Sequence, residues 1–171
     1  MTFTKNLLII AVICCSVYAI RAIEDEKVVP IEVTADDLLP FQEVNNGRLL
    51  GATPNPEDCL ELTRKQIEGT LIVKLADFIN DLLVQELIEA GELPDGKYKW
   101  GKVTGCVSSD GHGGYILKLD VTEKNICTHK CYDFKVVIHI CSDYTVKLVS
   151  ADTCPIDCSC FSEPILSVPS L

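Results

Sequence analysis

The hydrophobic positions of this chain follow a helical spacing through its middle and an alternating spacing after residue 97. In the middle segment, apolar side chains recur every three or four residues, as they do along one face of a helix. The residues of this apolar stripe are Leu60, Ile67, Leu71, Leu75, Phe78, Ile79, Leu82 and Leu83. The pattern predicts a long helix with one buried face.

The ends of this helix are marked by residues that favour helix termini. Asn55 can cap the first turn, Pro56 suits the first helical position, and Gly91 is typical of a helix end. A straight helix over residues 56–90 would be about 50 Å long, whereas a domain of this size is about 35 to 40 Å across. We therefore expect a bend near Gly69 or strong curvature around a sheet.

Alternating apolar and polar residues after residue 97 predict four strands that pair in two hairpins. The expected strands cover residues 98–107, 115–122, 133–141 and 145–150. The glycine-rich loop 108–114 joins the first pair, and the second pair turns around residues 142–144. A helix followed by an antiparallel meander predicts an α+β fold, in which the sheet buries one face against the helix.

The first 22 residues have the features of a secretory signal peptide. Lys5 precedes an apolar run over residues 7–20, and the small residues Ala19 and Ala22 lie at its end. The run is too short and wrongly flanked for a membrane span, and no later run approaches the roughly 18 apolar residues that a span needs. We expect cleavage after Ala19 or Ala22, secretion, and disulfide pairing of the cysteines that follow.

The mature chain is strongly acidic. Residues 1–22 contain Lys5 and Arg21 and no acid, so 13 Lys and Arg remain against 25 Asp and Glu, a net charge of −12 over 149 residues. This charge disfavours nucleic acid and anionic membranes and is compatible with a protein partner. We expect an acidic extended arm over residues 23–54, with a short strand at 28–33, one domain over 55–154, and a C-terminal tail over 155–171 tied by cysteines.

Three stretches of the C-terminal half carry a family resemblance: GYILKLDVTEKNIC (114–127), KCYDFKVVIHIC (130–141) and TVKLVSADTC (145–154). In the order of their strands and cysteines they resemble the cystatin superfamily, especially its cathelicidin-type branch, and the resemblance extends over residues 47–154. It implies a long helix cradled by a curved antiparallel sheet. It also implies the disulfides Cys127–Cys131 and Cys141–Cys154.

Four cysteines remain after those two pairs: Cys59, Cys106, Cys158 and Cys160. A bridge between Cys158 and Cys160 would be strained, because one residue separates them. We therefore expect the tail to return to the body, with one of its cysteines bound to Cys59 on the helix and the other to Cys106 on the sheet. The sequence leaves open which goes where.

Cystatins inhibit papain-like cysteine proteases with a wedge of three pieces: an N-terminal glycine, a Gln-X-Val-X-Gly hairpin loop and a Pro-Trp hairpin. The resemblance implies the first piece at Leu49, Leu50 and Gly51, although Gly51 could equally be an ordinary glycine of the arm. The second piece fits Val103 and Gly105, although these could instead belong to a plain strand with a bulge. By strand register it is the loop that contains Gly111 and His112, which lacks the Gln and the Val of the motif. The third is missing, since Trp100 precedes the first hairpin and the turn at residues 142–144 is too short and polar to replace Pro-Trp.

The sequence gives little support to catalysis. The histidines His112, His129 and His139 could serve a cysteine nucleophile, but disulfide pairing would remove the thiolate that such chemistry needs. A metal site at Cys154, Cys158, Cys160 and His129 is chemically possible, yet secretion favours disulfides. We expect no enzyme, no metal and no cofactor. The expected function is weak inhibition of papain-like proteases, or else non-inhibitory binding by a secreted carrier, venom, salivary or humoral protein.

Overall fold

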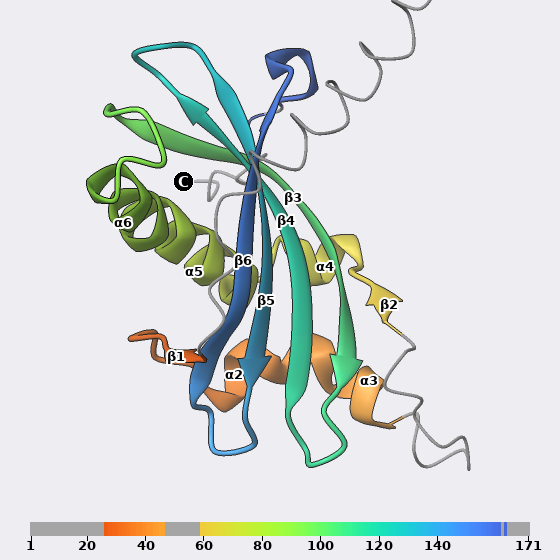
Figure 1. Cartoon of the computed structure of the whole chain (residues 1–171). Coiled ribbons are helices and arrows are strands. Elements are labelled where there is room, and N and C mark those ends of the chain that lie inside the picture. Colours follow the sequence, from red (N-terminus) through yellow and green to blue (C-terminus); the bar gives the residue numbers. More distant parts are fainter. Residues whose placement is uncertain (1–25, 47–58, 162, 164–171) are drawn as a thin grey trace, which may run out of the picture.

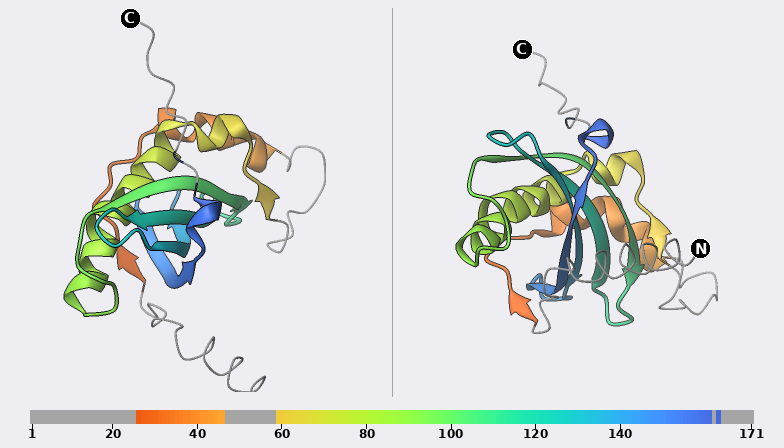
Figure 2. Two further views of the ribbon diagram at one scale, coloured as in Figure 1. Left: turned by 90° about the horizontal axis from the view of Figure 1, so that it is seen from above. Right: turned by 45° about the horizontal axis from the view of Figure 1, so that its top comes forward.

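The computed structural model describes residues 26–46, 59–161 and 163, and it is an α+β fold. Six strands form one antiparallel sheet in the order β1-β6-β5-β4-β3-β2. The helices lie together on one face of this sheet, as Figure 1 and the view from above in Figure 2 show. The signal peptide, Leu49 to Gly51 and the expected helix start at Asn55 and Pro56 lie outside the described residues.

The four expected strands are confirmed, and each of them is longer than its apolar pattern predicts. They are β3 (Tyr98–Ser109), β4 (Tyr115–Asn125), β5 (Cys131–Ile140) and β6 (Val146–Ile156). Two short edge strands complete the sheet: β1 (Lys27–Val28) pairs with β6, and β2 (Leu60–Glu61) pairs with β3. Since β6 continues to Ile156, the sheet extends past residue 154, where we expected the domain to end.

The expected helix is interrupted after its first turns. The part before the break is α4 (Arg64–Ile67), and the part after it is one continuous helix made of α5 (Thr70–Phe78), the π-helical turn η3 (Ile79–Leu83) and α6 (Val84–Glu89). The predicted break is confirmed at Gly69, which caps α5, and Gly91 follows the last piece with a φ of 73°. The predicted start is wrong, because Leu60 lies in strand β2 and Thr63 caps the first helical turn together with Gln66.

The acidic arm is also not extended throughout. It contains α2 (Ala35–Leu38), the 3-10 turn η1 (Leu39–Phe41) and α3 (Gln42–Asn46). Pro40 suggested an extended segment, but it lies in the first turn of η1, where a missing N–H costs nothing. Phe41 is buried and its ring centroid lies 6.1 Å from that of Tyr115, so this segment packs on the sheet.

The hydrophobic core lies between the helices and the facing side of the sheet. Alternate residues of β4 and β5 are buried there, in keeping with the two-residue period of a strand. The fully buried side chains include Leu71, Leu75, Ile79, Leu117, Leu119, Phe134, Ile138 and Ile140. The sheet therefore buries one face against α5 and η3, as its sequence pattern predicts.

Candidate functional site

The loops of the two hairpins lie at the same end of the sheet. Residues 110–114 join β3 to β4, and residues 141–145 join β5 to β6. In an antiparallel meander the first and third connections share one end, and both loops are at the bottom of Figure 1. A Cβ added to Gly113 would lie 3.6 Å from Cβ of Ser142, so the loops are in contact range. We call residues 110–114 and 141–145 the loop surface.

Asp110 holds the first loop in place. Its carboxylate accepts hydrogen bonds of 2.8 Å from the backbone N–H groups of His112 and Gly114, and it lies 2.8 Å from Nε2 of His139 on β5. The side chain of Asp110 is only 8% exposed. Burial opposes its ionisation, but the hydrogen bond from His139 and those from the two amides outweigh burial and hold the pKa of Asp110 below its usual value.

Glycine is required at several positions of this loop. Gly111 and Gly113 have φ values of 82° and 91°, a region that L side chains rarely adopt. A Cβ on Gly114 would come within 2.3 Å of the Ile140 carbonyl oxygen and 2.4 Å of the Asp110 carboxylate. The loop is therefore a fixed turn built around Asp110, with Gly111 and His112 exposed at its tip.

The second loop presents an aromatic side chain. Tyr144 has a φ of 69° and is 44% exposed, and its N–H donates to the Cys141 carbonyl oxygen at 2.9 Å. Asp143 accepts a 3.0 Å hydrogen bond from the Thr145 N–H, and bonds from Thr145 lower the pKa of Asp143. Sequence reasoning dismissed this turn as too short and polar. Its signal was an aromatic residue at the tip of a tight turn.

Two residues expected at the binding surface lie elsewhere. Val103 is in the middle of β3 and only 5% exposed, so it belongs to the core and cannot contact a partner. Gly105 lies two residues further along the same strand, where a Cβ would come within 2.1 Å of the Lys118 carbonyl oxygen. Its role is a close approach of two strands, and we exclude both residues from the loop surface.

The disulfides differ from those expected. Cys59 is bonded to Cys106, where we expected a tail cysteine at each of them. Their Cα atoms are 5.3 Å apart, because strand β2, which begins directly after Cys59, pairs with β3 and sets Glu61 opposite Cys106. The missed signal was strand β2, since sequence reasoning placed residue 59 in a helix.

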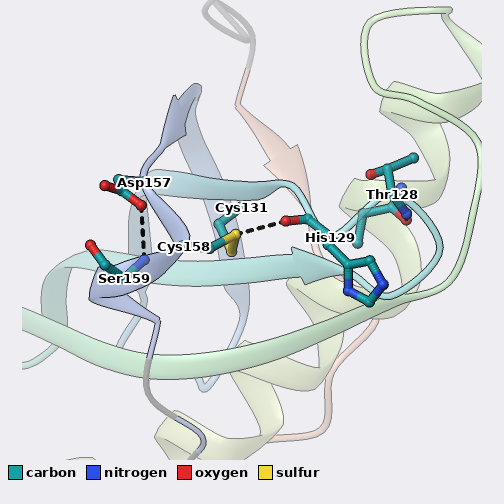
Figure 3. Close-up of a disulfide and its surroundings, with 7 residues drawn as sticks. Thr128, His129, Cys131, Asp157, Cys158 and Ser159 are labelled. Atoms are coloured by element: carbon teal, nitrogen blue, oxygen red, sulfur yellow. Dashed lines mark hydrogen bonds between the residues drawn. A yellow bond between two sulfur atoms is a disulfide. The ribbon is translucent and has the colours of Figure 1, made fainter.

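The second disulfide joins Cys131 to Cys158, and the expected bridge Cys127–Cys131 is wrong (Figure 3). Cys131 begins β5 opposite Ile156 of β6, so Cys158 arrives beside it two residues later. Sγ of Cys158 lies 3.0 Å from the His129 carbonyl oxygen. Asp157 accepts a 3.0 Å hydrogen bond from the Ser159 N–H and so caps the turn η4 (Cys158–Cys160).

The expected bridge Cys141–Cys154 is excluded by the register of the sheet. Cys154 is opposite Asp133, and eight residues along β5 separate Asp133 from Cys141. At about 3.3 Å per residue this is about 26 Å, whereas the Cα atoms of a disulfide lie within about 7 Å. Cys127, Cys141 and Cys154 carry no disulfide in the structure.

The described residues offer no metal centre. No group of three or more His, Cys, Asp or Glu among residues 26–46, 59–161 and 163 could hold a metal ion. The metal-ligand set that the sequence allowed, around Cys154, is not available, because Cys158 is bonded to Cys131.

His139 lies beside Asp110, a contact that no sequence signal indicated.

In the described part of the chain, no helix is long and apolar enough to cross a membrane.

Comparisons with protein-family models, with curated proteins and with solved structures find no match to this chain.

Proposed function

We propose that this protein is secreted and that its loop surface binds a protein partner, which is a papain-like cysteine protease inhibited weakly and reversibly. The observation that carries the proposal is the juxtaposition of two hairpin loops, one fixed by Asp110 and one tipped by Tyr144. The expected piece at Leu49, Leu50 and Gly51 would complete the surface.

The rigidity of the first loop supports binding. A loop already held in one conformation loses little conformational entropy when it docks, so more of the contact energy appears as affinity. Asp110 supplies this order through two backbone amides and His139. The exposed ring of Tyr144 adds the kind of side chain that is enriched at the centres of interfaces.

The missing pieces of the wedge limit the strength of inhibition. The loop 110–114 has neither the Gln nor the Val of the cystatin motif, and the loop 141–145 has no Pro-Trp pair. An occluding wedge gains most of its affinity from a few buried apolar contacts, so we expect affinity of about micromolar order.

Non-inhibitory binding on the same fold is the second candidate. The observation that favours it is the Cys131–Cys158 bridge, because the cystatin resemblance implies that Cys131 pairs with Cys127. On this alternative the protein is a secreted carrier or effector, and the loop surface serves a partner other than a protease.

Secretion is part of both candidates. Two disulfides fit an oxidising compartment, where disulfides form and persist. The N-terminal segment, with Lys5 and the apolar run that follows it, has the features of a secretory signal peptide and so also supports secretion.

The experiment is titration of papain and of a cathepsin with the refolded mature protein. We expect partial, reversible inhibition at micromolar concentrations, which weakens when residues 108–114 are replaced, when Tyr144 is changed to Ser, or when Gly51 is changed to Trp. Ile126→Ser is the matched control, because Ile126 is also 44% exposed but lies in the turn at the opposite end of the sheet. Absence of inhibition at high micromolar concentration would favour the non-inhibitory candidate. Nanomolar inhibition unchanged by these variants would show that the surface is elsewhere.

A further inference from the structure

A buried carboxylate lies between the sheet and the long helix, away from the loop surface. Glu123 of β4 shares a face with Leu119 and Val121 and is 0% exposed. Neither of its carboxylate oxygens has a hydrogen-bond partner in the structure, and the same is true of Oδ1 of Asn80 on η3. Buried polar atoms are nearly always paired, and each unpaired one costs about 1 to 3 kcal/mol. All three of these atoms can accept a hydrogen bond.

Aromatic side chains flank this carboxylate on the sheet. Glu123 is directly opposite Trp100 on β3 and Tyr132 on β5, so the three side chains stand side by side on the helix-facing side. Tyr98, two residues before Trp100, packs on Tyr132 with ring centroids 6.0 Å apart. An acid beside several aromatic rings is the arrangement that proteins use for organic ammonium ions.

The helix adds two more acids from the other side. Asp77 and Asp81 are exposed, and Nε1 of Trp100 donates a 2.8 Å hydrogen bond to Asp77. Burial, and then the charges of Asp81 and Asp77, raise the pKa of Glu123 to about 8. Asn80 and Asp81 lie in the π-helical turn η3, and such turns occur frequently at functional sites.

A hollow of about 370 Å³ opens beside these residues. Asp77, Asn80, Tyr98 and Trp100 line it, and a neighbouring hollow of about 420 Å³ shares Asn80, Lys97 and Tyr98 with it. This volume suits a small molecule. Glu123 lies beneath, outside the lining of both hollows, so a ligand would reach its carboxylate by a shift of the side chains above it.

The chemical groups of the site limit the kinds of ligand that it can bind. The unpaired oxygens of Asn80 and Glu123 can accept hydrogen bonds, and Asp77 at the first hollow and Asp81 at the second attract a cation, so the site favours a positively charged hydrogen-bond donor. The residues do not form a metal-binding group, which leaves an organic cation. Lys97 and Lys99 also line the first hollow, and Lys99 pairs with Glu163 at 2.9 Å. Glu163 therefore offsets the charge of Lys99, and the charge of Lys97, which lines both hollows, disfavours a ligand with a second positive charge.

We infer that the hollow between η3 and β3 binds a small aromatic monoamine, whose ammonium group lies among Asp77, Asn80 and Glu123 and against the rings of Tyr98 and Trp100. This amine site is independent of the loop surface and of protease inhibition.

Binding at the amine site moves a proton. Near pH 7 Glu123 is largely protonated, because its pKa is about 8. The positive charge of the incoming ammonium ion favours the ionised form of Glu123, so Glu123 releases its proton to the solvent. The electron pair that remains on the carboxylate accepts a hydrogen bond from the ligand. The bound state contains one carboxylate and one ammonium ion, and one proton appears in the buffer.

The experiment uses the fluorescence of Trp100, which is the only tryptophan of the chain and lines the hollow. The probes are phenethylamine, the diamine putrescine and the anion phenylacetate, added to the full disulfide-bonded chain. Phenethylamine should shift the emission saturably, putrescine should bind at least about tenfold more weakly, and phenylacetate should have no saturable effect. Calorimetry near pH 7 in buffers of different ionisation enthalpy should show release of up to one proton.

Two variants test the assignment. Glu123→Gln keeps the shape of the side chain, should weaken phenethylamine binding at least tenfold and should abolish proton release. Asp77→Asn tests the exposed acid if the first variant does not fold, and it should weaken binding severalfold. Glu89→Gln removes an exposed acid from α6 and should leave phenethylamine binding and proton release unchanged.

The inference would be overturned if the emission of the folded wild type did not shift up to about 10 mM amine, a concentration at which an affinity of about 1 mM would be evident. Equal affinity in wild type, Glu123→Gln and Asp77→Asn would overturn it as well.

Discussion

Nε2 of His139 lies 2.8 Å from Oδ2 of Asp110, so strand β5 holds the loop that joins β3 to β4. The two residues are 29 positions apart in sequence, and the sheet brings them together because Ile116 of β4 pairs with His139. Through this contact the buried base of the loop is fixed to the end of β5. It is the contact on which the rigidity of the loop surface depends.

Replacing Asp110 by Ala should loosen the loop. The side chain is 8% exposed and accepts from two amides and His139, so its loss should cost about 1 to 3 kcal/mol of unfolding free energy. Hydrogen exchange should show faster exchange of the Gly114 amide, and urea denaturation gives the stability. The change Asp143→Ala in the neighbouring loop is the control, since Asp143 is exposed and contacts only its own turn through Thr145, and it should leave Gly114 exchange unaltered. Unchanged exchange in the Asp110 variant would contradict this account.

The pH dependence of the same contact has a definite sign. The pKa of Asp110 is lowered in the folded state, so its ionised form stabilises the fold above the ordinary pKa of 3.8 and this contribution is lost as pH falls through the folded pKa. Wild type should therefore lose stability in acid below about pH 4 more steeply than Asp110→Ala. Parallel acid-unfolding curves for the two proteins would show that the carboxylate is not the group responsible.

Gly105 should tolerate no side chain, and this tests its structural role. A Cβ there would come within 2.1 Å of the Lys118 carbonyl oxygen at a φ of 154°, so Gly105→Ala must displace β4 and should cost about 2 to 3 kcal/mol. Gly91→Ala is the matched control, because Gly91 also has a positive φ but has no atom within 4 Å of its added Cβ. It should cost only about 1 kcal/mol of backbone strain. Thermal denaturation of the two variants compares them. Equal losses of stability in the two variants would mean that the close approach of residue 105 to the Lys118 carbonyl oxygen does not contribute to the cost.

The sequence predicts the elements of this fold better than their connections. The stripe from Leu71 to Leu83 and the alternation along β3 to β6 report burial directly, because burial is a property of each side chain and its neighbours in sequence. Disulfide partners depend on register instead. Cys131 meets Cys158 only because β6 continues to Ile156, and β2 escapes notice because two residues are too short to show a period.

In the candidate site, too, the elements could be predicted from the sequence but the contacts between them could not. The glycines of residues 111–114 mark the first loop, and the hairpin pattern predicts its place in the fold. The partners that fix it are invisible in sequence, since Asp110 and His139 come from different hairpins. Val103 matched a loop motif by its residue type but is a core residue by its position. Glu123 lies just beyond the strand expected over residues 115–122, and only the folded sheet, in which β4 continues to Asn125, shows that its carboxylate is buried.

Peptide mapping under non-reducing conditions should recover Cys59 linked to Cys106 and Cys131 linked to Cys158. The second bridge closes 27 residues, so its loss in Cys158→Ser should lower the unfolding free energy by about 3.5 kcal/mol on the chain-entropy estimate. Cys154→Ser is the control, because Cys154 carries no disulfide, and it should leave stability nearly unchanged. Recovery of Cys127 linked to Cys131 would contradict the structure and support the pairing that the cystatin resemblance implies.

Glu123 should give the protein a stability that decreases as the pH rises. Its pKa is raised from 4.5 to about 8 by burial and by Asp81 and Asp77, so between those two values the folded state binds a proton that the unfolded state has released. The unfolding free energy should therefore fall from about pH 4.5 to about pH 8 and level off above, with a total loss on the order of 3 to 5 kcal/mol. Urea midpoints measured in steps from pH 5 to pH 9 test this directly, without any amine present.

Two variants identify the titrating group. Glu123→Gln has no proton to lose, so it should abolish most of the slope of stability against pH and be more stable than wild type at pH 9. Asp81→Asn removes one repelling charge and should move the upper end of the transition to lower pH. A slope that persists unchanged in Glu123→Gln would mean that another group titrates, and the buried carboxylate would then not be the acceptor on which the amine site depends.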